Sequence, residues 1–294
     1  MNGNWVNRSE KLSDLGRVLR RNFELWNYRE VLLPSIEGYD EALDKGTKFT
    51  DGGDFYLVKP DITSQILTKL NPGKSYKLFY ISEVLDGKTD GNWQFGAEYI
   101  GGDERWMIIE IITAIITGLE SLGIRDFFID IGSRAVWESV TSDLSVEEDV
   151  FNALYHRSFD MIDDLPIDDK KKNEIWELFN YRDKTCEYER LNGILEILDD
   201  DRLYADFGTV RGMSYYEDLT FEIYSPEVGS PLGGGGEYSF HDEGACGFAF
   251  NLDNLVENFP GPEERPREEI SLNSSGKLKR AKEQVEAGNA IEVI

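Results

Sequence analysis

The stretch YKLFYISEVL, residues 76–85, predicts a strand, and the stretch WQFGAEYI, residues 93–100, predicts a second one. The polar, glycine-containing loop between them favours an antiparallel hairpin. Gln94 and Glu98 are four residues apart on the second strand, so both side chains point to the same face. A carboxylate beside a carboxamide can hold a cationic or ammonium-bearing small ligand. Two satisfied polar residues on a solvated face fit the spacing at least as well.

Helices and further strands flank this hairpin. The helix that precedes it carries an apolar stripe made of Leu12, Leu15, Leu19, Phe23 and Trp26. A strongly apolar helix follows at residues 106–122, and shorter strands are predicted at residues 29–34, 127–131 and 215–224. Antiparallel strands interrupted by helices indicate an α+β fold, with an antiparallel sheet flanked by helices.

The chain is predicted to contain one large domain, residues 1–260, and a tail, residues 261–294. Residues 145–201 are acidic and amphipathic throughout, which we interpret as a helical insertion in the large domain. The tail begins with a linker composition and continues with one short helix and an apolar strand. A helix and a strand alone are too small to form an independent core.

Composition excludes several classes of protein. The chain has 294 residues, of which 40% are hydrophobic, and its 31 Lys and Arg against 57 Asp and Glu give a net charge of −26. This charge disfavours binding to nucleic acid through phosphates, and solubility or adaptation to a salty cytoplasm is a plainer explanation of it. No apolar run approaches the ~20 residues of a membrane span, and no signal peptide is visible, so we expect a soluble cytoplasmic protein. Two histidines and two cysteines, each pair far apart, predict no metal site, and no cofactor is expected.

Two other segments place polar groups in strand-like surroundings, where burial without a partner is costly. Asp61 or Thr63 is a candidate N-cap of a short helix. Arg211, beside Gly212, offers a guanidinium fork for a ligand carboxylate. A salt bridge from Arg211 to one of the many acidic residues is the alternative.

Tyrosines and glycines mark the remaining candidates. Tyr215 and Tyr216 point to opposite faces of their strand, so one of them meets a ligand or both simply fill the strand. The glycine run 233–236, which precedes Tyr238, does not match a phosphate-binding loop. It allows the backbone to approach a ligand or another strand, or it forms a flexible turn.

Together and in this order, these segments resemble the catalytic domain of histidyl-tRNA synthetase, a class II aminoacyl-tRNA synthetase fold. The likeness extends from about residue 8 to about residue 258. It rests on five segments that are similar to motif 1, motif 2, two histidine-specific signatures and motif 3, namely residues 27–37, 78–101, 210–216, 235–238 and 247–255.

The resemblance implies a pocket for histidine. Its members would be Asp61, Thr63 and Gln94 for the amino group, Glu98 and Tyr216 for the imidazole, Arg211 for the carboxylate, and Tyr215 and Tyr238 to complete the pocket. Two positions depart from the family pattern: Asp61 stands where a Glu is usual, and Ser214 stands where an Asp is usual.

The positions that would bind ATP depart further. The motif 2 arginine that would clamp the α-phosphate is Asp86 here, and the motif 3 arginine is Asn254. Activating an amino acid requires cations where negative charge develops on the transferring phosphate. The residues after Gly261 resemble only the opening helix and strand of an anticodon-binding domain. The sequence therefore predicts loss of the ATP and tRNA functions.

A synthetase-like chain that keeps histidine recognition resembles the regulatory subunit of ATP phosphoribosyltransferase. The resemblance implies a subunit without catalysis of its own, which activates a short-form catalytic subunit and mediates feedback inhibition by histidine in histidine biosynthesis. It also implies a homodimer within a hetero-octamer, with no nucleic acid or membrane partner. Two alternatives stay open: a divergent class II synthetase-like enzyme that activates an amino acid, and a synthetase-like binding module for another partner.

Overall fold

The computed structural model describes residues 2–43, 46–58, 61–85, 91–142, 144, 146–156, 158–209, 216–261, 267–270, 277–288 and 290–293. The chain divides into two compact units, Met1–Pro260 and Gly261–Ile294. Among the described residues, no helix combines the length and the apolar character needed to cross a membrane.

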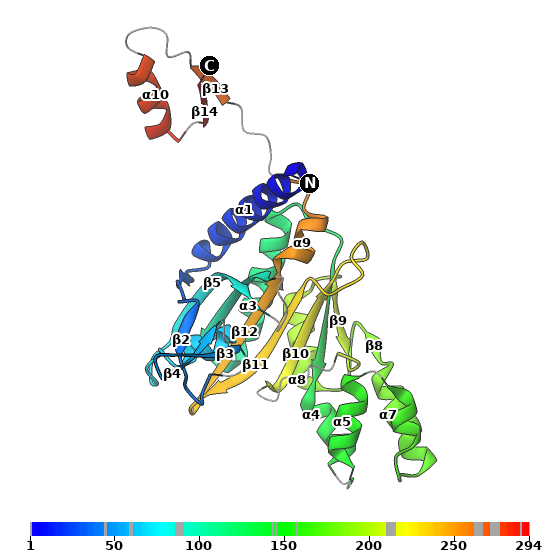
Figure 1. Cartoon of the computed structure of the whole chain (residues 1–294). Helices are drawn as coiled ribbons and strands as arrows, with labels where there is room; N and C mark the ends of the chain where they lie inside the picture. The colour runs from blue at the N-terminus through cyan, green and yellow to red at the C-terminus, as the bar shows by residue number, and fades with distance from the viewer. Residues whose placement is uncertain are drawn as a thin grey trace. The chain divides into compact units, whose positions relative to one another are not determined.

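A mixed sheet forms the centre of the first unit (Figure 1). Its described strands, in spatial order, are β1 (Arg29–Glu30), β5 (Tyr76–Val84), β6 (Asn92–Ile100), β12 (Glu243–Asn251), β11 (Gly233–Phe240), β10 (Tyr216–Tyr224), β7 (Phe128–Ser133), β9 (Leu203–Asp206) and β8 (Arg182–Asp183). Neighbouring strands are antiparallel except for the pairs β1–β5 and β7–β9, which are parallel. The sheet is thus antiparallel in its centre, as predicted, and parallel pairs lie near both ends.

The predicted hairpin is confirmed as β5 and β6. Leu78 pairs with Glu98 and Ser82 pairs with Gln94, so the two polar side chains share one face of the sheet. The residues of the connecting loop from 86 to 90 lie outside the described part of the chain.

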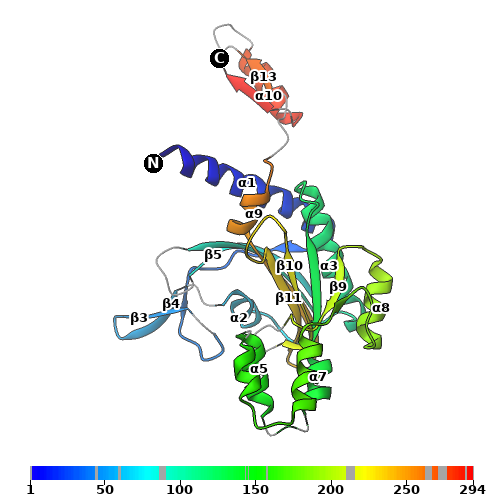
Figure 2. The same cartoon turned by 90° about the vertical axis from the view of Figure 1, so that its right-hand side faces the viewer.

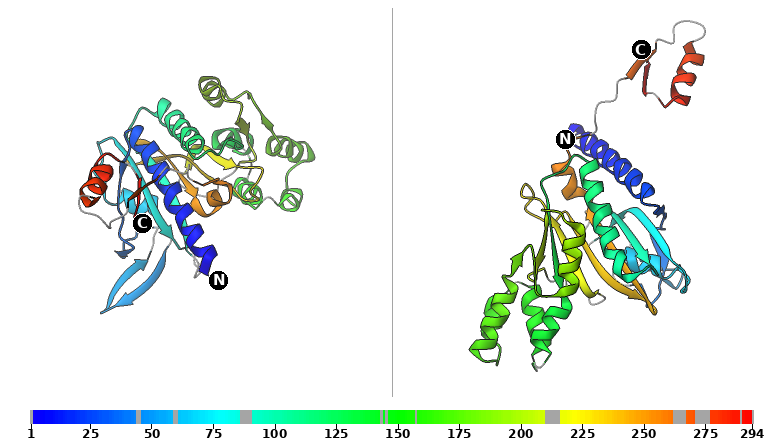
Figure 3. Two further views of the ribbon diagram at one scale, coloured as in Figure 1. Left: turned by 90° about the horizontal axis from the view of Figure 1, so that it is seen from above. Right: turned by 180° about the vertical axis from the view of Figure 1, so that it is seen from behind.

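Helix α1 (Asn2–Leu25) packs on α3 (Glu104–Ser121) and α9 (Leu252–Asn258), which in turn pack on the central sheet (Figure 3). All three helices contribute side chains to the apolar core of the first unit. The predicted stripe of α1 faces this core, because Leu15, Leu19 and Phe23 are fully buried. The ring of Phe23 lies 4.9 Å from that of Phe95 on β6, between ring centroids. Helix α1 therefore joins the sheet through aromatic packing.

The segment predicted as a helical insertion contains one strand as well as helices. Its helices are α5 (Glu147–Tyr155), α6 (Phe159–Asp163), α7 (Asp169–Phe179) and α8 (Glu189–Leu198), and α4 (Arg134–Thr141) precedes them. Figure 2 shows α5 and α7 side by side. Strand β8 pairs with β9 and so extends the central sheet, while α8 packs on β9 and α3. The expectation that the whole segment is helical is therefore wrong at β8, between α7 and α8, because a strand of two residues is too short to show a period in the sequence.

The glycine run 233–236 lies in β11, between β10 and β12, so it is a central strand and not a flexible turn. A Cβ added at Gly235 would lie 2.0 Å from the carbonyl oxygen of Gly247 on β12. Glycine is required here because the neighbouring backbone occupies the place of a side chain.

A small three-stranded sheet, in the order β2 (Ile36–Gly38), β4 (Asp54–Val58) and β3 (Thr47–Asp51), projects beside the central sheet (Figure 2). Helix α2 (Ile62–Leu67) follows β4 and packs its buried Ile62 and Ile66 against Leu78 and Tyr80 of β5. This places α2 over the face of the hairpin that carries Glu98.

The second unit contains β13 (Arg267–Ile270), α10 (Lys277–Glu286) and β14 (Ala290–Val293). The predicted helix and strand of the tail are both present. Strand β13, which the sequence did not indicate, pairs in parallel with β14. Residues 262–266, predicted as a linker, lie outside the described residues.

Candidate ligand-binding site

A cavity of about 260 Å³ lies between α2 and the central strands of the first unit. Six of the eight predicted histidine-binding residues line it: Asp61, Thr63, Gln94, Glu98, Tyr216 and Tyr238. The other two, Arg211 and Tyr215, belong to the segment 210–215, which lies outside the described residues. The structure thus brings together residues from α2, β6, β10 and β11 that are far apart in the sequence.

Glu98 is the central acidic group of the cavity. Its side chain is only 2% exposed. Thr63 donates a hydrogen bond from Oγ1 to Glu98 Oε1 at 2.7 Å, and Tyr238 donates one from its hydroxyl to Oε2, also at 2.7 Å. Both carboxylate oxygens are therefore held in place from two different elements, α2 and β11.

Burial raises the pKa of Glu98 to about 7. The hydrogen bonds from Tyr238 and Thr63 oppose this rise because they stabilise the ionised form, whereas the negative charge of Asp61 adds to it. The carboxyl therefore titrates near neutral pH, and a cation bound beside it would favour its ionised form.

Stability should reveal this titration in the variant Glu98→Gln. The pKa of Glu98 is about 7 in the folded chain and 4.5 ordinarily, so its stabilising effect is complete below pH 4.5 and is lost as the pH rises through 7. Glutamine has no such dependence. We expect the free energy of unfolding of the variant, relative to the parent, to rise between pH 5 and pH 8 by on the order of 3 kcal/mol.

Urea unfolding of both proteins at the two pH values measures the change. The exposed Glu257→Gln in α9 is the control, and its difference from the parent should stay within about 0.5 kcal/mol at both pH values. A difference between Glu98→Gln and the parent that does not change with pH would contradict the assignment.

Asp61 both caps α2 and lines the cavity. As the N-cap, its carboxylate accepts the backbone N–H of Ser64 at 2.9 Å and the Ser64 hydroxyl at 3.0 Å. Thr63, the other predicted cap, instead directs its hydroxyl to Glu98. The two candidates thus have different roles, which the sequence pattern left open.

Small residues make room for the polar groups of the cavity. Gly247 of β12 pairs with Glu98, and a Cβ added there would lie 1.9 Å from Glu98 Oε2. Gly96 of β6 pairs with Tyr80, and a Cβ added there would lie 2.4 Å from the Tyr80 ring and hydroxyl. Both glycines are therefore needed for the positions of Glu98 and Tyr80.

Tyr80 and Glu222 also line the cavity, although neither was predicted to belong to the site. For Tyr80 a signal existed, because it pairs with the residue midway between Gln94 and Glu98. Glu222 lies between Phe221 and Ile223 on β10, and both of these side chains are fully buried. The side chain of Glu222 therefore points to the other face of the sheet from theirs. Nothing in the local sequence shows that this face belongs to the cavity.

The described charged residues that line the cavity are all acids, namely Asp61, Glu98 and Glu222. Tyr224 donates its hydroxyl to the carboxylate of Glu222. This arrangement favours a ligand with a positively charged or hydrogen-bond-donating group. It disfavours a phosphate at the same place.

The two positions predicted to have lost phosphate-binding arginines differ in what the structure says of them. Asn254, in α9, donates from Nδ2 to the carbonyl oxygen of Pro231 at 2.8 Å, and Pro231 lines the cavity. Asp86 lies outside the described residues. The neutral side chain at 254 is thus engaged by a neighbouring loop.

Comparison with known proteins shows similarity over most of the chain. The family model described as histidyl-tRNA synthetase matches residues 6–181 and 167–255. A histidine–tRNA ligase of Pyrococcus furiosus is 27% identical over 301 residues, which cover 81% of this chain and 69% of that protein. An ATP phosphoribosyltransferase regulatory subunit of Geobacter metallireducens is 26% identical over 319 residues, which cover 90% of this chain and 73% of that protein.

A solved structure of the ATP phosphoribosyl transferase (HisG:HisZ) complex from Thermotoga maritima contains a similar fold. It aligns with a TM-score of 0.69 at 18% identity, over 81% of this chain and 96% of that one. Together with the family model, this confirms the predicted α+β fold of the class II synthetase type. Enzymes and regulatory subunits both occur among the similar proteins.

Proposed function

Because the chain belongs to the histidyl-tRNA synthetase family, we propose that its cavity binds free histidine and that it is a regulatory subunit of ATP phosphoribosyltransferase. The observation that carries the proposal is the buried Glu98, which Thr63 and Tyr238 hold in a cavity whose described charged lining residues are acids. Such a site suits a ligand with two nitrogen-bearing groups, an ammonium and an imidazole.

Each half of histidine has suitable partners. Asp61, Thr63 and Gln94 supply oxygen acceptors for the ammonium group. Glu98 faces the imidazole, whose pKa of about 6.5 is close to the value of about 7 for Glu98 itself. The pair can therefore share one proton near neutral pH without paying for two buried charges. Arg211 is proposed as the partner of the ligand carboxylate, Tyr216 as the second partner of the imidazole beside Glu98, and Tyr215 as a residue that completes the pocket.

The nucleotide positions support a regulatory role over a catalytic one. Asp86 and Asn254 stand where the family resemblance implies arginines on the ATP phosphates. An aspartate repels the α-phosphate, and an asparagine supplies no charge. The net charge of −26 also disfavours tRNA as a partner.

The similar regulatory subunits support the choice of partner. We propose that the chain forms homodimers that join a short-form catalytic subunit in a hetero-octamer and activate it. Histidine would inhibit by binding one state of this complex better than the other, and typical couplings of this kind are about 1–3 kcal/mol. The chain would carry out no chemical step and need no cofactor.

Reconstitution tests the proposal. Adding this chain to a short-form ATP phosphoribosyltransferase should raise its turnover, and histidine should then lower it. Calorimetry of the chain alone should show binding of histidine and none of alanine, which has the same ammonium and carboxylate groups but lacks the imidazole.

Two results would contradict the proposal. A histidine-dependent exchange of pyrophosphate into ATP would show that the chain is an enzyme after all. A folded chain that neither binds histidine nor alters the turnover of the catalytic subunit would favour a binding module for a different partner.

A further inference from the structure

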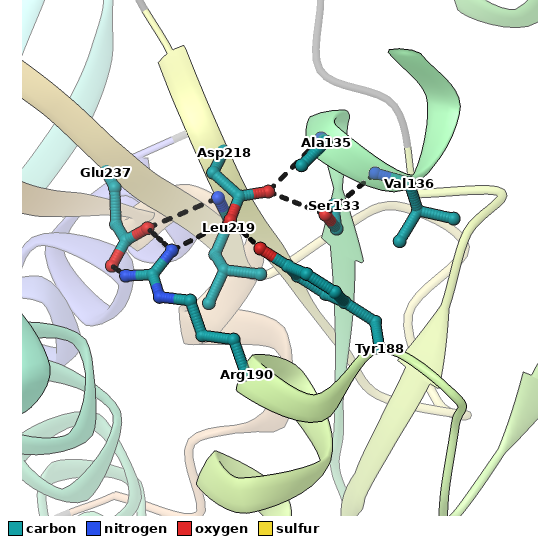
Figure 4. A network of polar contacts seen from close by, with 8 residues as sticks. All are labelled: Ser133, Ala135, Val136, Tyr188, Arg190, Asp218, Leu219 and Glu237. Carbon is teal, nitrogen blue, oxygen red and sulfur yellow. Dashed lines mark hydrogen bonds and ion pairs between the residues drawn. The ribbon is translucent and has the colours of Figure 1, made fainter. Parts of the chain in front are cut away.

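Arg190 joins the start of α8 to two strands of the central sheet (Figure 4). Its guanidinium contacts both oxygens of Glu237 on β11, with Nη2 to Oε1 at 2.5 Å and Nη1 to Oε2 at 2.8 Å. The same Nη1 donates to Asp218 Oδ2 on β10, also at 2.8 Å. One cation thus bridges carboxylates from adjacent strands.

These contacts lie at an irregularity in the pairing of β10 with β11. Tyr216 pairs with Tyr238 and Thr220 pairs with Gly236, so residues 217–219 of β10 stand opposite Glu237 alone. The bulge leaves Leu219 without a register partner on β11, and its backbone N–H donates instead to Glu237 Oε2 at 3.3 Å. The Glu237 side chain therefore completes the hydrogen bonding of the bulge.

Asp218 ties the bulge to a third strand. Its Oδ1 accepts the hydroxyl of Ser133, at the end of β7, at 2.6 Å and the backbone N–H of Ala135 at 3.2 Å. Its Oδ2 accepts the hydroxyl of Tyr188, just before α8, at 2.8 Å. The bulge is therefore fixed to β7 on one side and to the start of α8 on the other.

Tyr216 and Tyr238, the pair at one end of this bulge, line the ligand cavity on the other face of the sheet. Glu237 and Tyr238 are consecutive on β11, so their side chains point to opposite faces. Tyr238 holds Glu98 through its hydroxyl, and Tyr216 lines the cavity opposite it in the strand pair. A shift in the bulge would move both tyrosines.

We propose that Arg190 is a positioning residue of the ligand cavity: by holding Glu237 and Asp218 together, it fixes the bulge that sets Tyr216 and Tyr238. The identity of the ligand, histidine, rests on the function proposed above. Without Arg190, the carboxylates of Asp218 and Glu237 would face each other across the bulge, and Glu237 is only 9% exposed. Their repulsion would open the bulge and loosen Tyr238 from Glu98.

The variant Arg190→Met removes the charge and keeps much of the apolar length. We expect it to bind histidine about 10-fold more weakly, the size of effect typical of coupled neighbours. The N–H of Leu219 should also exchange with solvent at least about 10-fold faster, because its acceptor is no longer held. Arg190→Lys keeps the positive charge but lacks the two-pronged guanidinium. Its histidine affinity and its Leu219 N–H exchange rate should therefore lie between those of Arg190→Met and the parent.

A second substitution separates positioning from general loss of structure. The double variant carries Arg190→Met and Glu237→Gln. The amide oxygen at position 237 still accepts the Leu219 N–H, and the negative charge that Arg190 paired is gone. We therefore expect the histidine affinity to return to within about threefold of that of the parent. Arg134→Met in α4, which breaks an exposed pair with Glu138, is the control and should change neither readout.

These measurements decide the proposal. Histidine affinity of Arg190→Met within twofold of the parent, or a double variant no better than the single one, would overturn it. If Arg190→Met does not fold, the same comparison made with Arg190→Lys decides. If the parent binds no histidine, the function proposed above fails, and the exchange rate of the Leu219 N–H still shows whether Arg190 holds the bulge.

Discussion

Histidine should bind the variant Glu98→Gln on the order of 100-fold more weakly than it binds the parent chain. The substitution keeps the shape of a side chain that is 2% exposed and removes its charge. In the proposed complex, a buried, charge-assisted hydrogen bond to histidine would be replaced by a neutral one, and breaking such a pair costs about 2–5 kcal/mol. Calorimetry at pH 7.5 measures the change directly.

Two controls test whether a loss of histidine affinity in Glu98→Gln has another cause. Glu257→Gln makes the same chemical change on an exposed position of α9 and should leave the histidine affinity unaltered. Unfolding in urea at pH 8 should show that Glu98→Gln is at least as stable as the parent, since the buried charge is gone. A loss of histidine affinity smaller than threefold in a folded Glu98→Gln variant would contradict the central role assigned to Glu98.

The variant Gly235→Ala should lose about 3 kcal/mol or more of the free energy of unfolding. The added methyl group would lie 2.0 Å from the Gly247 carbonyl oxygen and 2.7 Å from the Phe248 Cα. Both obstacles are backbone atoms of β12, so no side chain can rotate away, and relief requires β11 and β12 to separate. Thermal or urea unfolding of the two proteins gives the difference.

Gly193→Ala in α8 is the matched control for Gly235→Ala. Its added methyl group meets nothing within 4 Å, and alanine favours a helix over glycine by about 0.5–1 kcal/mol, so a gain in stability is expected. The two identical substitutions should therefore have opposite signs. A loss below 1 kcal/mol at Gly235 would show that the two strands yield more easily than their spacing indicates.

The hairpin of β5 and β6 was predictable because two strand-like segments, which form strands of nine residues each, enclose a polar, glycine-containing loop. The spacing of four residues on one strand placed Gln94 and Glu98 on the same face, and the register confirms it. The apolar stripe of α1 was predictable because Leu15, Leu19 and Phe23 repeat at helical spacing, and all three are buried. Regular repeats over long segments carry this information within the sequence itself.

Other features depend on contacts between distant segments and left no local pattern. Thr63 meets Glu98 across 35 positions of sequence, and Tyr238 meets it across 140. Arg190 was not recognised because its partner Glu237 is 47 positions away and arginines near helix starts have no characteristic spacing from such partners. The family resemblance, not periodicity, brought Thr63 and Tyr238 together before the structure did.

The two roles of Asp61 limit which substitutions are tolerated at one end of the cavity. The same carboxylate that closes the first turn of α2 also faces the ligand space, and the turn that it closes carries Thr63 to Glu98. A residue chosen only for ligand affinity risks unwinding that turn, while one chosen only as a good cap risks the wrong charge toward the ligand. A change of ligand specificity is therefore more accessible through Gln94 or Tyr216, which lie on strands and cap no helix.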